Sequence, residues 1–263
     1  MAISRPAAGG GRWVEVDPAR LERWLEGFRA RHGEPRVRGG SGPVVLTGAD
    51  GAVAELHPPP GAAREVARGG AGGAAGGVAG GVAADGAGDG GAAELAEFVA
   101  RARAPRRLGL LLARQGAAAV GVAEGDRLLT SKVDSWYVQG RTAAGGQSQQ
   151  RFARRRGNQA AAAAGKAADL AYRLLLPAAP DLAAVVTGGD RRTVETILAD
   201  RRLAPLAALR AERHLAVATP NLAVLRQAVH AARAVAIRLP PRPDPADLGE
   251  VQPDSPDSGM NHS

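Results

Sequence analysis

The chain has 263 residues, of which 45% are hydrophobic and 3% aromatic, with 34 basic against 26 acidic side chains and no cysteine. This length allows one large domain or two small ones, and the apolar content allows a core of leucine, valine and alanine. The lack of cysteine excludes disulfide scaffolds, thiolate metal sites and thiol nucleophiles, and no apolar run is long enough to cross a membrane. We therefore expect a cytoplasmic protein without a membrane partner.

The first sixty residues are predicted to form a small α/β unit. Alternating apolar and polar residues at 13–16 indicate a strand, and Asp17 suits the N-cap of the helix that follows. Strand-like runs at 44–47 and 52–56 flank an Asp-Gly pair, which is typical of a hairpin turn. We assign this unit to residues 1–60, and the sequence leaves open whether its strands join a larger sheet.

Glycine and alanine dominate residues 61–91. We expect a flexible linker or loop there, because so few side chains can be buried to offset backbone ordering. Order is predicted to resume with a helix over 92–103. Three or four strand-like runs follow between 108 and 139, and the short turns between them indicate an antiparallel meander.

Further along, the apolar period changes to that of a helix. Alanines and leucines from Ala160 to Leu175 recur on one face and predict a long helix that ends before Pro177. Strands and helices then alternate. The expected fold class is α/β or α+β, with helices packed on a mixed β-sheet, and the domain spans 92–240. The tail, 241–263, is rich in proline, aspartate and serine and is expected to be disordered.

Positive charge is concentrated in one segment. Between Ser135 and Ala168 there is no acidic residue, although the net charge of the whole chain is only +8. Such a concentration marks a surface for a polyanion, and its arginines are spaced to share one helical face. An ordinary solvated helix face is the alternative. The basic residues of the segment are Arg141, Arg151, Arg154, Arg155, Arg156 and Lys166.

A short motif, Gly145-Gly146-Gln147-Ser148, precedes this helix. We expect it in a loop that joins a strand to the helix, with Ser148 as the N-cap. Free backbone N–H groups at a helix start attract anions, and two glycines let the backbone approach a ligand closely. Gln147 would then be presented at an exposed, positively charged tip.

The run from Gly145 to Arg156 resembles the GGQS…RFAR.R sequence in the middle domain of eukaryotic and archaeal peptide-chain release factors. The rest of the chain is unlike a termination factor and is more similar to the Vms-type release factors, specifically to their actinobacterial branch. Those proteins use a related domain to free nascent chains from stalled ribosomes. The resemblance implies a release-factor-type domain at 92–240, with an exposed GGQ loop between a strand and a long helix.

The resemblance also implies a reaction, namely attack on the end of peptidyl-tRNA in the peptidyl transferase centre of the large ribosomal subunit. Gly145, Gly146 and Gln147 would be the catalytic residues. The Gln147 backbone N–H would stabilise the developing oxyanion or leaving group, and its side chain would help to place water. Ser148 and the basic residues would contact nucleic acid.

The ribosome and the tRNA would supply the remaining groups, and no cofactor is implied. This explains why the segment has no histidine or carboxylate to act as a general base. In a second version of the reaction the cut falls in the tRNA 3′ end, with the terminal 2′-hydroxyl as nucleophile. The sequence leaves ester and phosphodiester cleavage open.

Other chemistries have weaker signals. The five histidines stand far apart, so we predict no metal site, and there is no G-x-S-x-G elbow for a serine nucleophile. A strand end before Asp190 resembles a phosphate-binding turn, but Asp190 as an N-cap would occupy the free donors. Trp136 and Tyr137 are candidates for stacking on bases, although one of them should lie in the core because neighbours in a strand point to opposite faces.

Three hypotheses follow. The first is a codon-independent release factor that cleaves peptidyl-tRNA on stalled ribosomes, and it depends on Gln147. The second is a non-catalytic RNA- or ribosome-binding module that docks through residues 141–166, which needs the arginines and makes no special use of one glutamine. The third makes the motif a chance product of Gly/Arg-rich coding, and it predicts a loop packed into the fold.

Overall fold

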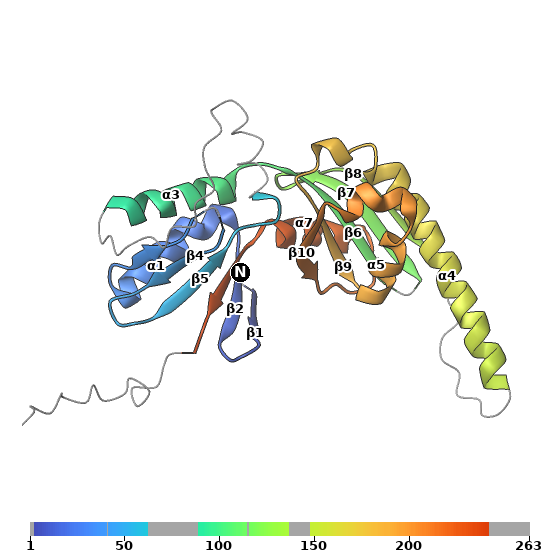
Figure 1. Cartoon of the computed structure of the whole chain (residues 1–263), viewed down its shortest axis with the longest axis horizontal. Coiled ribbons are helices and arrows are strands. Elements are labelled where there is room, and N and C mark those ends of the chain that lie inside the picture. Colours follow the sequence, from blue (N-terminus) through green and yellow to red (C-terminus); the bar gives the residue numbers. More distant parts are fainter. Residues whose placement is uncertain (1–2, 41, 63–88, 115, 137–147, 242–263) are drawn as a thin grey trace, which may run out of the picture.

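The computed structural model describes residues 3–40, 42–62, 89–114, 116–136 and 148–241. Two β-sheets form the framework, one of six strands and one of five. Figure 1 shows them side by side, the first built mainly from the blue and cyan N-terminal strands and the second from green to orange strands. Each sheet with the helices packed on it is called a unit below. The helix that follows the GGQ run, on which the release-factor hypothesis depends, packs on the second sheet and so belongs to the second unit.

The first sheet is entirely antiparallel, with the order β1-β2-β11-β5-β4-β3. The expected strand at 13–16 and the expected hairpin are both present. Their neighbours at the sheet edges and in its middle are strands that the sequence patterns did not indicate. The six strands are β1 (Ile3–Pro6), β2 (Arg12–Val16), β3 (Arg36–Arg38), β4 (Val44–Thr47), β5 (Val53–His57) and β11 (Val235–Leu239).

The last strand of the chain, β11, lies in the middle of this N-terminal sheet. It pairs with β2 on one side and β5 on the other, and Figure 1 shows it in red among the blue strands. The guanidinium of Arg238 donates to a carboxylate oxygen of Glu55 at 3.0 Å across the β11–β5 pair. Residues 13–57 thus do not join the second sheet; instead, the segment 235–239 returns to complete the first.

Two helices cover one face of the first sheet. Helix α1 (Leu21–His32) follows a short 3-10 turn, η1 (Pro18–Arg20), whose N-cap is Asp17 as expected, with its side chain accepting from Ala19 N at 2.8 Å. Helix α3 (Asp89–Arg103) packs beside α1. The shared core contains Phe28, Phe98, Leu46, Leu56 and Ile237, all buried.

The domain boundaries drawn from sequence, 1–60, 61–91, 92–240 and 241–263, differ from the packing in two places. Helix α3 and strand β11 fall within 92–240 but belong to the core of the first sheet. The physical reason is that Phe98 and Ile237 bury their side chains against N-terminal strands that are remote in sequence. Most of the expected linker and nearly all of the tail lie outside the described residues.

The second sheet is mixed, with the order β10-β9-β6-β7-β8. Strands β6, β7 and β8 form the expected antiparallel meander, and β9 and β10 add to β6 in parallel. The expected fold class, a mixed sheet with helices packed on it, is therefore confirmed. The strands are β6 (Arg107–Arg114), β7 (Ala117–Glu124), β8 (Arg127–Ser135), β9 (Ala184–Gly189) and β10 (Arg210–Leu215).

Helices cover both faces of the second sheet. On one face, residues of α4, α5 and α6 share a core with Leu111, Val120 and Val185. On the other, α7 packs against Leu108, Leu110 and Val186. The helices are α4 (Ser148–Leu175), α5 (Arg191–Leu198), α6 (Ala204–Ala207) and α7 (Leu222–Arg233), with the 3-10 turns η3 (Ala179–Asp181) and η4 (Arg201–Leu203) between them.

Candidate functional site

The glycine-glycine-glutamine motif falls between β8 and α4. Strand β8 ends at Ser135 and helix α4 begins at Ser148, directly after Gln147. The expected sequence of strand, connection and long helix is therefore confirmed by the elements on either side. Ser148 is the first residue of the helix, so the helix begins one position earlier than expected. Arg141, Gly145, Gly146 and Gln147 lie outside the described residues, and their roles stay predictions.

The first turns of α4 carry the arginine cluster. Positions 151, 154 and 155 share one face of a regular helix, because residues three and four apart are neighbours on the helix surface. The side chains of Ser148, Arg151, Arg154, Arg155 and Arg156 fall outside the part of the chain whose side chains are described. Lys166, farther along, is exposed.

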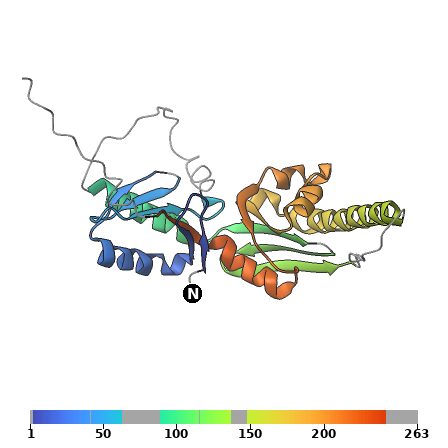
Figure 2. The same ribbon diagram turned by 90° about the horizontal axis from the view of Figure 1, so that it is seen from below.

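The N-terminal half of α4 extends beyond the second sheet. In the described part of this helix, the first buried residue is Ala164, and the residues from Gly157 to Ala163 are exposed or half-buried. Residues 148–163 correspond to about 24 Å of helix at 1.5 Å per residue. Figures 1 and 2 show this end pointing away from the rest of the molecule. The apolar stripe expected from Ala160 onward is therefore buried only in its second part.

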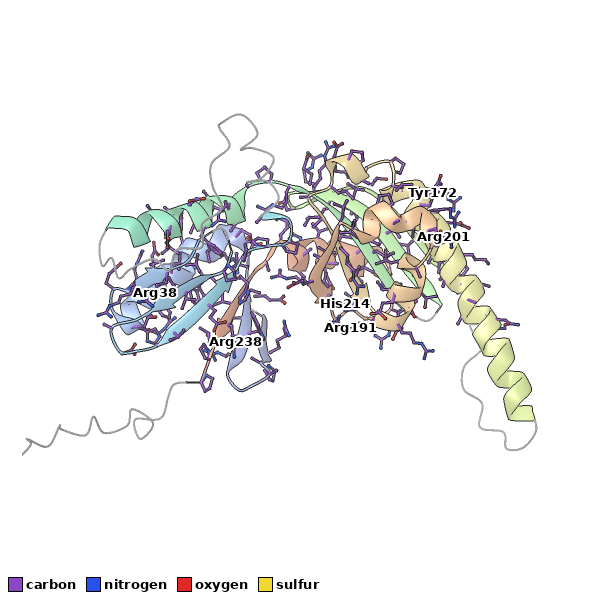
Figure 3. The ribbon with its side chains drawn as sticks, in the orientation of Figure 1. Arg38, Tyr172, Arg191, Arg201, His214 and Arg238 are labelled. Carbon is purple, nitrogen blue, oxygen red and sulfur yellow. The ribbon has the colours of Figure 1, made fainter. Side chains whose placement is uncertain are left out.

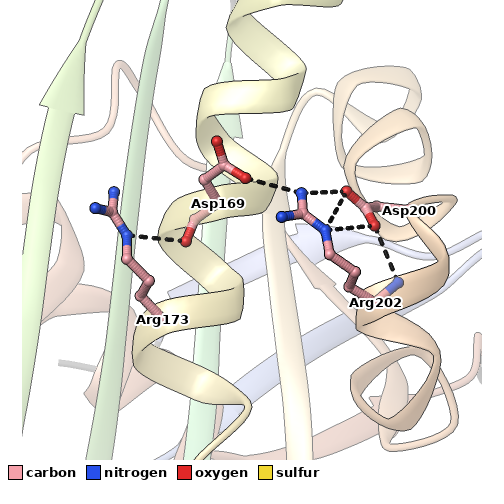
Figure 4. Close-up of polar contacts among 4 residues, drawn as sticks. All are labelled: Asp169, Arg173, Asp200 and Arg202. Atoms are coloured by element: carbon pink, nitrogen blue, oxygen red, sulfur yellow. Dashed lines mark hydrogen bonds and ion pairs between the residues drawn. The ribbon is translucent and has the colours of Figure 1, made fainter.

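The C-terminal half of α4 fixes the helix to the second unit. Leu170, Ala171 and Leu175 are buried in the core shared with α5 and β7. On the surface, the Arg202 guanidinium donates to Asp169 of α4 at 2.8 Å and to Asp200 at 2.7 Å, as Figure 4 shows. Hydrogen bonds from Arg202 also lower the pKa of the Asp200 carboxyl. The projecting half of α4 therefore continues from a well-anchored half.

Trp136 lies at the start of the connection that carries the motif. Its side chain is half-buried and packs against the same core as α4, and its backbone N–H donates to Gly116 O at 2.6 Å. The expectation that one of the two adjacent aromatic residues belongs to the core is thus confirmed for Trp136. Tyr137 lies outside the described residues.

The two histidines of the described residues with close hydrogen-bond partners serve the fold. His214 Nε2 is 3.0 Å from the carbonyl oxygen of Gly189, which can only accept, so Nε2 donates there. Its Nδ1 lies 3.0 Å from Oγ1 of the buried Thr187. Both ring nitrogens thus serve to hold the end of β9. His32, in α1, pairs with Asp50 at 2.9 Å.

Within the described ranges, no group of three or more histidine, aspartate or glutamate side chains is placed to hold a metal ion. A membrane-spanning helix is likewise not found among the helices of those ranges.

The turn after β9 is structural, as the sequence indicated. Asp190 is the N-cap of α5 and accepts from Thr193 N at 2.8 Å and from Thr193 Oγ1 at 2.7 Å. These two hydrogen bonds hold the pKa of the Asp190 carboxyl below its ordinary value, and the bond from the Thr193 hydroxyl has the larger effect. The Thr193 N–H, one of the backbone donors that would bind a phosphate, is therefore already in use.

We expect Asp190→Ala to lower the free energy of unfolding by about 1 kcal/mol at neutral pH through loss of the cap. Because the pKa of Asp190 is lower in the folded state than in the unfolded state, the ionised cap stabilises above the unfolded pKa. This stabilisation is lost as the pH falls through the folded pKa. Urea unfolding at neutral pH and at about pH 3 checks this. Asp190→Asn, which keeps a capping oxygen without a charge, should lack the part of the pH dependence that the wild type owes to this carboxyl, and a pH dependence equal to that of the wild type would contradict the prediction.

One comparison with known proteins, a match to a family model, agrees with the motif. Residues 106–238 match the family model described as the Actinobacteria/chloroflexi VLRF1 release factor. Among solved structures, the archaeal translation termination factor aRF1 is similar at 21% identity and a TM-score of 0.39, over 48% of this chain and 34% of that one. An archaeal protein is similar at 20% identity and a TM-score of 0.32, over 51% of this chain and 35% of that one. The chain thus spans about a third of the length of each. A search of curated proteins finds no match.

Proposed function

The chain belongs to the Actinobacteria/chloroflexi family of VLRF1 release factors, and we propose that it cleaves peptidyl-tRNA on stalled ribosomes, without reading a codon. Membership confirms the resemblance inferred from the GGQ run and supports a release-factor role in translation. The bond that it cuts, the stalled state that it acts on and the residues that act are parts of the proposal.

The observation that carries the proposal is the position of Gln147 in the chain. It directly precedes a helix whose first half extends about 24 Å past the second sheet, at 1.5 Å per residue. The peptidyl transferase centre lies inside the large subunit, so a catalytic group has to be presented at the end of a narrow projection. A projecting helix preceded by Gly145 and Gly146 suits this purpose, because the glycines leave no Cβ between the backbone and the tRNA end.

The proposed reaction is hydrolysis of the ester between the peptide and the terminal ribose of the tRNA. Water forms a bond to the ester carbonyl carbon, the bond to the ribose oxygen breaks, and that oxygen leaves with a proton as a hydroxyl. The Gln147 backbone N–H stabilises the charge that develops on oxygen, and its side chain orients the water. Ribosome and tRNA groups move the protons, since the motif has no base of its own.

The basic residues hold the tRNA end in this scheme. Arg141, Arg151, Arg154, Arg155, Arg156 and Lys166 neutralise phosphates, and no acidic residue lies between Ser135 and Ala168 to oppose them. The same charge supports the second candidate, a module that docks on ribosomal RNA without cleaving anything. The two candidates differ in whether peptidyl-tRNA remains intact after binding.

The test is incubation of purified stalled ribosome–peptidyl-tRNA complexes with the full chain, followed by gels that resolve both the peptide and the tRNA 3′ end. Free peptide with an intact tRNA end supports ester cleavage. A shortened tRNA, together with a peptide that carries the terminal nucleotides of the tRNA, supports the phosphodiester version. Intact peptidyl-tRNA on complexes that co-sediment with the protein overturns cleavage and leaves the docking module.

We expect Arg151→Ala/Arg154→Ala to weaken ribosome binding and to reduce the slope of log affinity against log salt by about 1 for each lost phosphate contact. Co-sedimentation at several salt concentrations measures this slope. The control is Arg127→Ala/Arg173→Ala, which removes the same charge from exposed positions away from the motif. An unchanged slope in the first variant would rule out the phosphate contacts.

A further inference from the structure

A large cleft separates the two sheets and has no part in the function proposed above. Its volume is about 1810 Å³, and it is lined by both units. From the first unit come residues of β1, β2, β5, β11, the turn η1 and the start of α1, and from the second come β10, the start of α5 and one side of α7. The GGQ motif directly precedes the projecting end of α4, and no residue of α4 lines the cleft. The cleft is therefore a separate surface.

One wall of the cleft is the face of the first sheet that α1 and α3 leave uncovered. Val14 and Val16 point to α1 and α3, so Trp13 and Glu15 point to the opposite face, which lines the cleft. The Trp13 ring is half-buried. The Arg5 guanidinium lies 5.6 Å from its centroid, and the His57 ring lies 5.0 Å away at a tilt of 60°. This wall therefore offers a flat aromatic group beside a cation.

The facing wall is β10, which is the edge strand of the second sheet. Arg210 begins this strand, and Arg191 lies at the start of α5; Figure 3 labels Arg191 and its neighbour in the cleft, His214. Arg213, on the same strand, is committed to the fold, because it donates to the carbonyl oxygens of Ala231 and Ala234 at the end of α7. The cations available to a ligand on this wall are thus Arg191 and Arg210.

The arginines that line the cleft form no ion pair with a described carboxylate, in contrast to several arginines outside it. Arg103, Arg107, Arg202 and Arg238 each form an ion pair with a carboxylate. Within the described ranges, none of the five cleft arginines that remain has a carboxylate partner, although four are exposed and the fifth is half-buried. These five are Arg5, Arg20, Arg23, Arg191 and Arg210. Unpaired guanidinium groups on two facing walls form a site for an anion.

Three carboxylates, Glu15, Asp17 and Glu212, also line the cleft. They would repel a uniformly anionic polymer such as an acidic polypeptide. A nucleic acid strand alternates anionic phosphates with neutral bases, so arginines can bind the phosphates while carboxylates accept from base amino groups. Trp13 adds a ring on which a base stacks, and stacking needs an unpaired base.

We propose that this cleft binds single-stranded RNA. A base stacks on the Trp13 ring and displaces the Arg5 guanidinium from it. The Arg5 side chain then binds a phosphate of the same strand. Arg191 and Arg210 bind phosphates from the facing wall. The protein then holds RNA at two places, at the GGQ end of α4 and in the cleft.

The test measures binding of a fluorescent 12-nucleotide single-stranded RNA to the full chain by anisotropy. We expect Arg5→Gln/Arg210→Gln to weaken binding about tenfold and to reduce the salt slope by about 1.4, at 0.7 for each phosphate contact to a single strand. The matched control, Arg127→Gln/Arg201→Gln, removes two exposed arginines outside the cleft and should change both values little. Equal losses in the two double variants would overturn the cleft as the site.

A second pair of variants tests stacking. Trp13→Leu should weaken binding of the single strand at least fivefold, whereas Trp13→Phe keeps a ring and should retain most of the affinity. Binding of a duplex of the same length, whose bases are stacked inside, should be the same for both variants. Circular dichroism and thermal melting establish that each variant is folded. Equal loss on single strand and duplex, or displacement of the RNA by polyglutamate at equal charge concentration, would overturn the proposal.

Discussion

Replacing Gln147 with alanine should abolish peptide release, by a factor of 100 or more, while leaving ribosome binding unchanged. The expected loss follows from the lack of any other candidate group: from Ser135 to Ala168 there is no histidine or carboxylate that could place or activate water. Phosphate contacts come from the arginines, so the docked complex should survive the change. Single-turnover release from stalled complexes measures the rate, and co-sedimentation measures binding.

The chain offers a close control for this variant. Gln150 is the same residue type three positions on, inside α4, where its backbone is helical. Gln150→Ala should therefore release peptide at nearly the wild-type rate. Release by Gln147→Ala at the rate of Gln150→Ala would refute the proposed role of the Gln147 side chain in orienting water.

Shortening the projecting half of α4 should also abolish release. Deleting residues 157–163 removes close to two helical turns, so the helix faces stay nearly in register while the motif moves back by about 10 Å. These residues are exposed or half-buried, and none of them belongs to the core, so the fold should be retained. Because a misplacement of even 1 Å can cost 100-fold in rate, no measurable release is expected. The measurement is the same release assay.

A variant of unchanged length separates the effect of the length of α4 from the effect of its side chains. Gly157→Ala, Asn158→Ala and Gln159→Ala together alter the side chains of this stretch, raise its helix propensity and keep the distance. This triple variant should release peptide normally. If the deletion variant, shown to be folded by its melting curve, released peptide as well as the triple variant, the length of α4 would have no role.

Local patterns were enough to predict the second sheet and the helix that carries the motif. Short turns between apolar runs identified β6, β7 and β8, since strands so connected have to pair with each other. The stripe from Ala164 to Leu175 has the helical period and is buried as expected. The family was recognisable for the same reason, because the GGQ run and its arginines are contiguous in the sequence.

Pairing between distant segments was not predictable in this way. The run Val235–Leu239 is short and directly follows α7, so its apolar residues resemble the end of that helix, and nothing local indicates partners as remote as Val14 and Leu56. Helix α3 was predicted, but its place beside α1 depends on Phe98 entering a core made by N-terminal strands. The cleft was missed for the same reason, since Trp13 and Arg210 meet only through the tertiary structure.

The extent of the projection was also missed. Alanine satisfies a helical stripe whether or not it is buried, so Ala160 and Ala164 look alike in the sequence. Only the packing distinguishes them, because the core formed with β7 and α5 includes Ala164 and leaves Ala160 exposed. An alanine-rich helix therefore predicts its own length well and its buried portion poorly.

The central place of β11 determines the order in which the two units can fold during synthesis. All strands and helices of the second sheet precede Val235, whereas the first sheet needs β11 between β2 and β5. During translation the second unit can therefore fold while the N-terminal strands still lack their middle partner. A chain truncated before Val235 would leave β2 and β5 with unpaired edges, which are templates for aggregation.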